Sequence, residues 1–385
     1  MATRREFIRG VGTAAAGVMI GGGVAGAAAR AVQGGRRRQV MVGGRRVKTI
    51  DIHTHGFTRA VVPLLRSSKV DWADIILSSA SGTRGGRITP DFLGPERVRF
   101  MDETGIDVQC ISINPYWNTA DRAMAARLIP MQNEGLAADC AKFPGRFAGL
   151  ASISLQHPDL AVQQAEHAVA KLGMPGIALP GNIAGEELSS PRFDPFWAKV
   201  QELGVPVFVH PQVEGGGFEE GRSFPAAMFE TRLAGSGNLS NTIHHPMETT
   251  LTFSHLIFDG TLDRFPKLRF IGAHGAGYMP AYIGRYDANC LRPDANCKIK
   301  RKPSDYFKDQ LMSDSLVFNA GELRLRVRQH GVGQVVLGSD HPAPWPVRPV
   351  DHVLDTQGLS DDDKFAILGG TLSKLLRIPQ FEATT

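Results

Sequence analysis

From residue 49 onward, short apolar runs alternate with longer segments whose apolar residues recur at helical spacing. Short apolar runs bounded by glycine and polar residues are typical of buried parallel strands, and the segments between them of amphipathic helices. The predicted strands cover 48–54, 107–113, 147–155, 176–180, 205–210, 268–274, 309–314 and 334–340. The predicted helices cover 93–104, 120–142, 158–172, 191–203, 247–263, 278–289, 320–330, 349–357 and 360–376. Eight strands that are each followed by a helix predict an α/β fold of the (β/α)8 TIM-barrel type.

The amino terminus departs from this pattern and predicts an export signal. Arg4 and Arg5 precede an apolar, Gly/Ala-rich run from Val11 to Ala29. The pattern resembles a twin-arginine signal, and an uncleaved N-terminal anchor is the alternative. We therefore expect a signal segment over residues 1–31, a solvated basic linker over 32–47 and a single barrel domain over 48–385. The twin-arginine export machinery is then an expected partner, and the periplasm the expected location.

The excess of basic residues is confined to the same end of the chain. The whole sequence carries 43 lysines and arginines against 38 acidic residues, a net charge of +5. Residues 1–48 hold ten of the basic residues and one acid, which leaves 33 basic and 37 acidic side chains in residues 49–385. A mildly acidic domain lacks the electrostatic footprint of a nucleic-acid-binding protein. We expect a small-molecule ligand.

The four cysteines lack zinc-finger spacing and are too few for a disulfide scaffold. Cys290 and Cys297 are the only two that lie close in sequence. A single bridge between them is one interpretation, and two unpaired thiols is the one that we favour.

Candidate metal ligands stand where the predicted strands end. Apolar runs lead directly into His53 and His55, into His210, into His274 and into Asp340. Residues i and i+2 of a strand share a face, so His53 and His55 can reach one ion. In a barrel of this type the carboxyl ends of the strands meet at one rim, where the chemistry takes place. Three imidazoles and a carboxylate suit a catalytic divalent metal, with zinc expected and manganese the alternative.

We expect a single ion with His274 and Asp340 as proton carriers. The end of the fourth strand carries Pro180 and Gly181 and no lysine, which a carbamylated bridge to a second ion would need. As a neutral imidazole, His274 can deprotonate or orient a metal-bound water. Asp340 can touch the metal and also carry a proton.

Several motifs resemble those of the amidohydrolase superfamily (amidohydrolase family 2) over roughly residues 48–378. The resemblance is to its non-oxidative decarboxylases, which act on 2-amino-3-carboxymuconate 6-semialdehyde and on aromatic acids. The motifs are Pro246–Thr250, Gly260–Leu268, Ala273–Gly275, Gly284-Arg285 and Leu337–Pro342.

The resemblance implies a role for each candidate residue. It implies that the metal ligands are His53, His55, His210 and Asp340, and that His274 is the catalytic histidine. It also implies that Arg285 binds a substrate carboxylate, often across a dimer interface, so we expect a homodimer. A second arginine of the family lies in the loop after the first strand, where Arg87 is the nearest match and Arg84 the competitor. Bidentate pairing with a carboxylate is the physical reason for arginine at such positions.

Three features depart from those decarboxylases and leave the substrate open. They are the export signal, the loop after His210 without its usual Trp-Asp-like lining, and His341 at a position of tyrosine. His244 and His245 are either pocket donors or residues of a helix entry. The favoured function is metal-dependent non-oxidative decarboxylation of an unsaturated or aromatic acid. The alternative is hydrolysis of a lactone, amide or C–C bond on the same scaffold, and a third hypothesis is an exported binding protein.

Overall fold

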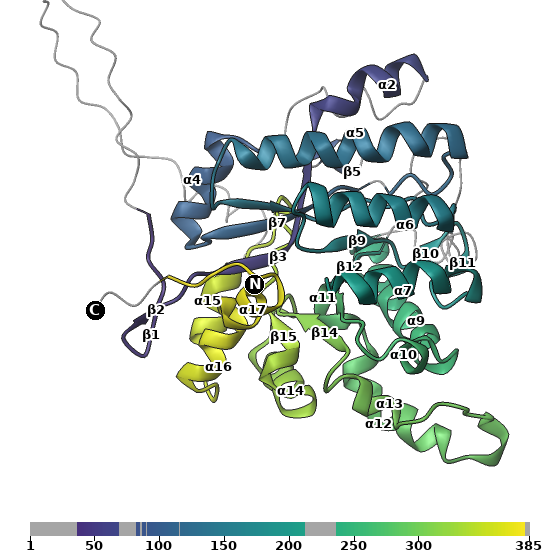
Figure 1. Ribbon diagram of the computed structural model, residues 1–385. Coiled ribbons are helices and arrows are strands. Elements are labelled where there is room, and N and C mark those ends of the chain that lie inside the picture. Colours follow the sequence, from purple (N-terminus) through teal and green to yellow (C-terminus); the bar gives the residue numbers. More distant parts are fainter. Residues whose placement is uncertain are drawn as a thin grey trace, which may run out of the picture. The chain divides into compact units, whose positions relative to one another are not determined.

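The computed structural model describes residues 37–68, 82–84, 87–89, 91–114, 116–211 and 236–381, with the backbone alone at 82–84, 87–89 and 91 (Figure 1). Gly35–Thr385 form one compact unit. The predicted signal segment, residues 1–31, lies outside the described residues. Within the described part of the chain, no helix combines the length and apolar character that a membrane span needs.

Two parallel sheets form the centre of this unit and confirm the predicted α/β class. The first has the order β6-β3-β7-β8, formed by Asp91–Phe92, Ile50–Phe57, Val108–Ser112 and Phe147–Gly149. The second has the order β9-β12-β13-β14-β15, formed by Ile177–Leu179, Val207–Val209, Phe270–Gly272, Leu311–Asp314 and Val335–Val336. Each of the eight predicted strands overlaps an observed one, although most observed strands are shorter.

Backbone pairing also joins the two sheets at two places. Beyond the end of β8, Ala151 forms a parallel bridge with Ile177 of β9. Beyond the end of β15, His341 forms a parallel bridge with Thr54 of β3. The carboxyl end of β15 is thereby fixed beside the carboxyl end of β3.

An apolar cluster takes residues from all eight strand regions. Its strand residues are Ile50, Ile52, Val108, Cys110, Leu150, Ala178, Phe208, Ile271, Met312 and Val336. Neighbouring strand residues point to the opposite face and belong to a larger cluster shared with the helices, as Val207 and Val209 do on either side of Phe208. Apolar side chains on both faces are expected of parallel strands that helices cover.

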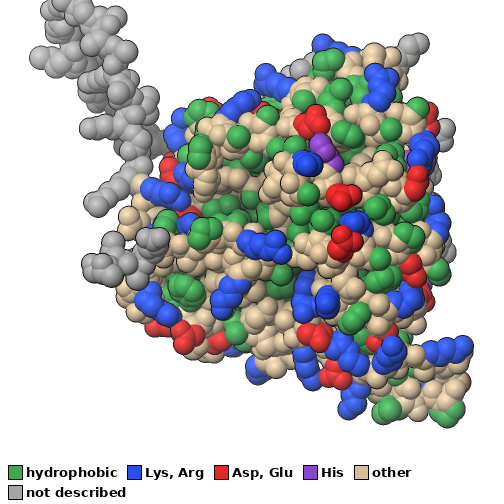
Figure 2. Space-filling view, in the orientation of Figure 1, with side chains coloured by type: hydrophobic (Ala, Val, Ile, Leu, Met, Phe, Trp, Pro, Cys, Tyr) green, Lys and Arg blue, Asp and Glu red, His purple; other side chains and the backbone are tan. Residues whose placement is uncertain are grey.

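Helices follow the strands at the predicted places (Figure 1). They are α4 Pro95–Thr104, α5 Arg122–Ala141, α6 Pro158–Glu166, α7 Asp194–Leu203, α9 His245–Phe258, α12 Met279–Cys290, α14 Ala320–His330 and α15 Pro349–Asp355. Shorter helices are α2 Val62–Ser67, α10 Thr261–Arg264, α11 Ala273–Ala276 and α13 Pro303–Tyr306. On the face drawn in Figure 2, basic and acidic side chains lie interspersed over the described residues.

The helix predicted over 360–376 is interrupted. It is observed as α16, Asp361–Phe365, and α17, Thr371–Leu375, on either side of a π-helical turn, Ala366–Gly370. Gly369 lies so close to the start of β3 that a Cβ there would come within 2.0 Å of Lys48 O. Only glycine permits this approach, which packs the C-terminal helices against the strand that carries His53.

The part of the predicted solvated linker (32–47) that the structure describes begins at Arg37 and differs from the prediction. From Arg37 onward the segment is packed on the domain, and it contains the antiparallel pair β1, Met41–Val42, and β2, Arg45–Arg46. Its contacts come from alternating valines and from two arginines that pair with the buried Asp107; these residues are Val40, Val42, Val47, Arg37 and Arg46. The run of basic residues predicted solvent exposure. The burial of the valines on one side of the segment outweighs that tendency and packs the segment on the domain.

The cysteines at the end of α12 are bonded to each other, which corrects the interpretation as unpaired thiols. Cys290 and Cys297 form a disulfide with Cα atoms 5.3 Å apart, within the range that a bridge requires. The chain turns back directly after α12, so a separation of seven residues suffices. Cys110 and Cys140 are free.

Candidate metal centre

His53 and His55 lie near the carboxyl end of β3, every residue of which is buried. His53 Nδ1 lies 2.6 Å from a carboxylate oxygen of Asp314, and His55 Nδ1 lies 2.9 Å from Ser112 Oγ. The Nε2 atoms of both rings face Asp340, whose Oδ1 is 3.2 Å from His53 Nε2 and 3.1 Å from His55 Nε2. A fixed partner on Nδ1 that leaves Nε2 directed inward is typical of a metal-binding histidine.

His210 follows β12 directly and faces the same two imidazoles. Its Nδ1 lies 2.8 Å from Pro211 O, to which it donates its proton. Its Nε2 is buried and has no hydrogen-bond partner among the described residues. The ring centroid is 4.5 Å from that of His55 and 5.0 Å from that of His53.

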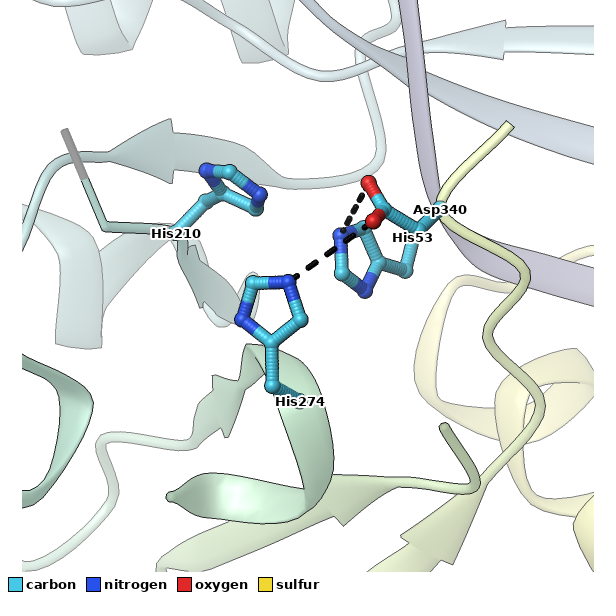
Figure 3. A group of neighbouring side chains, drawn as sticks. All are labelled: His53, His210, His274 and Asp340. Atoms are coloured by element: carbon cyan, nitrogen blue, oxygen red, sulfur yellow. Dashed lines mark ion pairs between the residues drawn. The ribbon is translucent and has the colours of Figure 1, made fainter. Parts of the chain in front are cut away.

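His274 stands on a left-handed turn after β13. His274 and Gly275 have φ angles of 54° and 65°, a conformation that L residues rarely adopt. Asp314, at the end of β14, fixes this turn because its carboxylate accepts the backbone N–H groups of His274 at 3.0 Å and Gly275 at 2.6 Å. The turn directs the imidazole at Asp340, and its Nε2 lies 3.8 Å from Asp340 Oδ2 (Figure 3).

Asp340 follows β15, also with a left-handed backbone, at φ 60°. Its two oxygens have different neighbours. Oδ1 faces the Nε2 atoms of His53 and His55, whereas Oδ2 accepts the indole N–H of Trp345 at 2.9 Å and faces His274.

The residues fit a divalent ion. Ligand atoms of His53, His210, His274 and Asp340 lie within 4.8 Å of one another (Figure 3). Burial disfavours a charged imidazole, yet the carboxylates of Asp340 and Asp314 outweigh it and raise the pKa of His53 to about 10. Although burial opposes ionisation, His53 and the neighbouring imidazoles hold the pKa of Asp340 well below its usual range. The buried carboxylates thus need a positive charge beside them, which a metal ion supplies while the imidazoles stay neutral.

All five residues predicted from the strand ends therefore lie together. His274 is one of the four residues whose ligand atoms lie within 4.8 Å of one another. His55 is outside that group of four, and its Nε2 lies 3.1 Å from Asp340 Oδ1. The division of the five into four ligands and one catalytic histidine stays a prediction.

The described contacts tie neither predicted arginine to the histidine cluster. Arg285 is exposed on α12, and the described contacts contain no hydrogen bond or ion pair between it and the histidine cluster. Arg87 is in β5, Arg87–Thr89, opposite Arg84 of β4, Gly82–Arg84. The side chains of Arg84 and Arg87 lie outside the described residues, so their predicted role is untested.

Of the two adjacent histidines, one belongs to the site. The ring centroid of His245 lies 5.3 Å from that of His274 and 5.9 Å from that of His210. His244 is fully buried, with its Nε2 3.8 Å from a carboxylate oxygen of Glu248. His244 is the last residue of a π-helical turn, Ser240–His244, and His245 follows it; such turns are often found near functional sites.

Three residues of the site escaped the sequence argument: Asp314, Trp345 and Asp51. Asp314 ends the strand predicted over 309–314, so the rule applied to Asp340 could have found it. Asp51 lies below His53 and accepts the hydroxyl of Ser339 at 2.5 Å; burial, opposed by hydrogen bonds from Ser339, raises its pKa to about 7.

Comparison with known proteins confirms the resemblance drawn from the motifs. A family model described as amidohydrolase matches residues 50–378. The chain is 28% identical over 287 residues to 2-amino-3-carboxymuconate-6-semialdehyde decarboxylase of Dictyostelium discoideum, with 73% of this chain and 75% of that protein covered. It is 27% identical over 298 residues to gamma-resorcylate decarboxylase of a Polaromonas species, with 73% of this chain and 86% of that protein covered.

Solved structures agree in fold. 5-Carboxyvanillate decarboxylase of Sphingomonas paucimobilis superposes with a TM-score of 0.73 at 24% identity, covering 86% of this chain and 100% of that one. Dihydroxybenzoic acid decarboxylase of a Polaromonas species, solved with manganese and 2-nitroresorcinol, superposes with a TM-score of 0.69 at 24% identity. The match covers 86% of this chain and 97% of that one.

Proposed function

We propose a function on the premise that the chain belongs to the amidohydrolase family and is an enzyme. The proposal is a metal-dependent non-oxidative decarboxylase of an aromatic or unsaturated carboxylic acid. The observation that carries it is the buried cluster of His53, His210, His274 and Asp340. The proteins named as decarboxylases among its relatives provide the reaction class.

A divalent ion at this site would act as a Lewis acid toward substrate oxygens. We expect it to be held by His53, His55, His210 and Asp340. Nitrogen donors favour zinc, and manganese is the alternative.

The protein residues would manage the proton. Loss of CO2 breaks a carbon–carboxyl bond and leaves its electron pair on the carbon, which must then gain a proton. Asp340 Oδ2 is 3.8 Å from His274 Nε2. Because this distance exceeds that of a direct hydrogen bond, a proton that His274 has taken from a water would reach Asp340 Oδ2 through one bridging water and pass from there to the carbon, as in general acid catalysis.

The test is CO2 release by the purified, metal-analysed protein on a panel of aromatic and muconate-type acids, with His274→Asn beside it. One ion per chain and CO2 release that the variant loses would support the proposal. Turnover without CO2, together with solvent oxygen in a product carboxylate, would refute decarboxylation and favour hydrolysis. A chain without bound metal would refute the ligand assignment.

We also infer that the two sheets close into one (β/α)8 barrel. The two backbone bridges between the sheets and the inner cluster that draws on all eight strand regions support it. A crystal structure in which β8 pairs with β9 and β15 pairs with β3 would support the closure, and an open gap at either place would refute it.

A homodimer through α12 is proposed from three exposed apolar side chains near Arg285. Tyr278 is 38% exposed, Tyr282 62% and Leu291 81%. Tyr282 lies within α12, and Tyr278 and Leu291 lie at its two ends. Exposed large apolar side chains along one segment are a feature of interfaces. Light scattering of the wild type and of Tyr282→Glu would test it, since a charge in the interface should give monomers.

Export through the twin-arginine route is supported by Arg4 and Arg5 and by the bonded Cys290 and Cys297. Disulfides persist in oxidising compartments such as the periplasm. Cell fractionation of the wild type and of a variant with both arginines replaced by lysine would test this localisation.

A further inference from the structure

The carboxylate of Asp340 needs an external partner to fix its orientation. The torsion that rotates an aspartate carboxylate is broad and has no strong preference of its own. Here the carboxylate is turned so that Oδ1 faces His53 and His55, while Oδ2 is 2.9 Å from Trp345 Nε1. Among the described contacts of Oδ2, the indole is nearer than His274 at 3.8 Å.

Trp345 is held in place by its backbone and by its ring. The backbone N–H of Trp345 donates to Ala343 O at 2.9 Å, and the backbone N–H of Ala343 donates to Asp340 O at 2.7 Å, so the loop is bonded to Asp340 itself. The ring of Phe318 packs against it with centroids 4.7 Å apart. Trp345 thus presents its N–H to Oδ2 from a fixed position.

An indole N–H donates and cannot accept, so Trp345 fixes an oxygen and moves no proton. Without it, the carboxylate of Asp340 loses the donor that fixes Oδ2 and is free to rotate, which turns Oδ2 away from His274. We propose that Trp345 is a positioning residue of the metal centre, which keeps Oδ1 of Asp340 directed at His53 and His55, where an ion would be held, and keeps Oδ2 directed at His274. The inference rests on the metal site of the proposed function and on no substrate.

The experiment measures Mn²⁺ binding by titration calorimetry to the full purified chain, freed of metal, as wild type and as Trp345→Phe. The variant keeps an aromatic ring beside Phe318 and loses the N–H donor, together with part of the ring area. Loss of a partner that orients a metal ligand typically weakens binding about 10- to 100-fold, and that is the expected change. In the Co²⁺-loaded protein, the ligand-field absorption bands should also change, because they report coordination geometry.

Trp197→Phe is the matched control. Its indole N–H donates to Leu188 O at 2.9 Å, and the side chain is buried away from the histidine cluster. It should leave Mn²⁺ affinity and the Co²⁺ spectrum unchanged. Phe318→Ala, which keeps the indole donor but removes its packing partner, should weaken Mn²⁺ binding less than Trp345→Phe does.

Wild-type affinity and an unaltered Co²⁺ spectrum in Trp345→Phe would overturn the inference. Equal losses in Trp345→Phe and Trp197→Phe would also overturn it, since a general effect on stability would then explain both. A wild type that binds no Mn²⁺ or Co²⁺ would instead refute the metal site of the proposed function.

Discussion

Replacement of Asp314 by asparagine should weaken metal binding and leave the fold intact. The carboxylate is fully buried and serves four donors. Oδ2 faces His53 Nδ1 at 2.6 Å and the N–H of His274 at 3.0 Å, while Oδ1 accepts from Gly275 at 2.6 Å and Leu316 at 3.1 Å. Asparagine keeps one oxygen that can accept from Gly275 and Leu316. Its amide N–H groups then face His53 Nδ1 and the backbone N–H of His274, which are donors as well.

The magnitude follows from the bond to His53. A hydrogen bond to a charged group contributes about 1.5–3 kcal/mol. Loss of the partner that orients a metal-binding histidine weakens affinity about 10- to 100-fold. That range corresponds to about 1.4–2.8 kcal/mol, so the two estimates agree. We expect a metal dissociation constant of Asp314→Asn in this range above that of the wild type.

The assay is calorimetric titration of the metal-free protein with Mn²⁺ at pH 7, with Asp51→Asn as control. Asp51 accepts two backbone N–H groups and the hydroxyl of Ser339, and an amide can satisfy all three. Because burial raises its pKa to about 7, the neutral form is already populated at that pH. Asp51→Asn should therefore bind Mn²⁺ as the wild type does.

Equal affinities of Asp314→Asn and wild type, with both proteins folded by circular dichroism, would refute the reasoning. It would mean that the contact with Asp314 does not orient His53 for a metal. An equal loss in both asparagine variants would instead point to the charge of the site as a whole.

Three further predictions concern the buried carboxyl of Glu248, the proposed dimer and the disulfide. Burial raises the pKa of Glu248 to about 8, although a hydrogen bond from Asn182 opposes the rise. As the pH increases, Glu248 loses its proton in the unfolded chain before it does so in the folded one. The free energy of unfolding should therefore fall by about 1.4 kcal/mol per pH unit from about pH 4.5 to 8. Urea unfolding across that range should show a shallower fall for Glu248→Gln, and parallel profiles would contradict the neutral carboxyl. Arg285→Ala and His274→Asn should each be inactive alone. If Arg285 serves the site of the partner subunit, an equal mixture of the two variants should recover about a quarter of wild-type activity, because half of the dimers are mixed and each mixed dimer has one intact site of two. No recovery would argue that Arg285 serves its own subunit. Replacing Cys290 by serine opens a loop of seven residues, which should cost about 2–3 kcal/mol of stability by the chain-entropy model; a melting temperature equal to that of the wild type would contradict this.

The positions of the strands and of the histidine cluster could be predicted because each depends on local sequence. A short apolar run fixes a parallel strand, and the residue that ends it lies at the common rim. His53, His210 and His274 follow this rule, and the structure brings them together with Asp340.

Other features depend on contacts that no local pattern records. Trp345 reaches Asp340 because their loop folds back on itself, and Gly369 interrupts a helix because Lys48 lies against it. The ordered basic segment arises from valines that pack on a surface distant in sequence. Arg285 is exposed in the single chain, and its predicted role would depend on an interface that a single chain does not contain.

The left-handed backbone at His274 and Asp340 bears on the choice of replacement in any mutational study. At φ 54° and 60°, alanine carries a strain of about 1–2 kcal/mol, whereas histidine, aspartate and asparagine tolerate this region better. An alanine scan would therefore combine the loss of a functional group with relaxation of the turn, and would overstate what the imidazole or carboxylate contributes. At these two positions asparagine isolates the side chain, and glycine, which relieves the strain, measures the backbone separately.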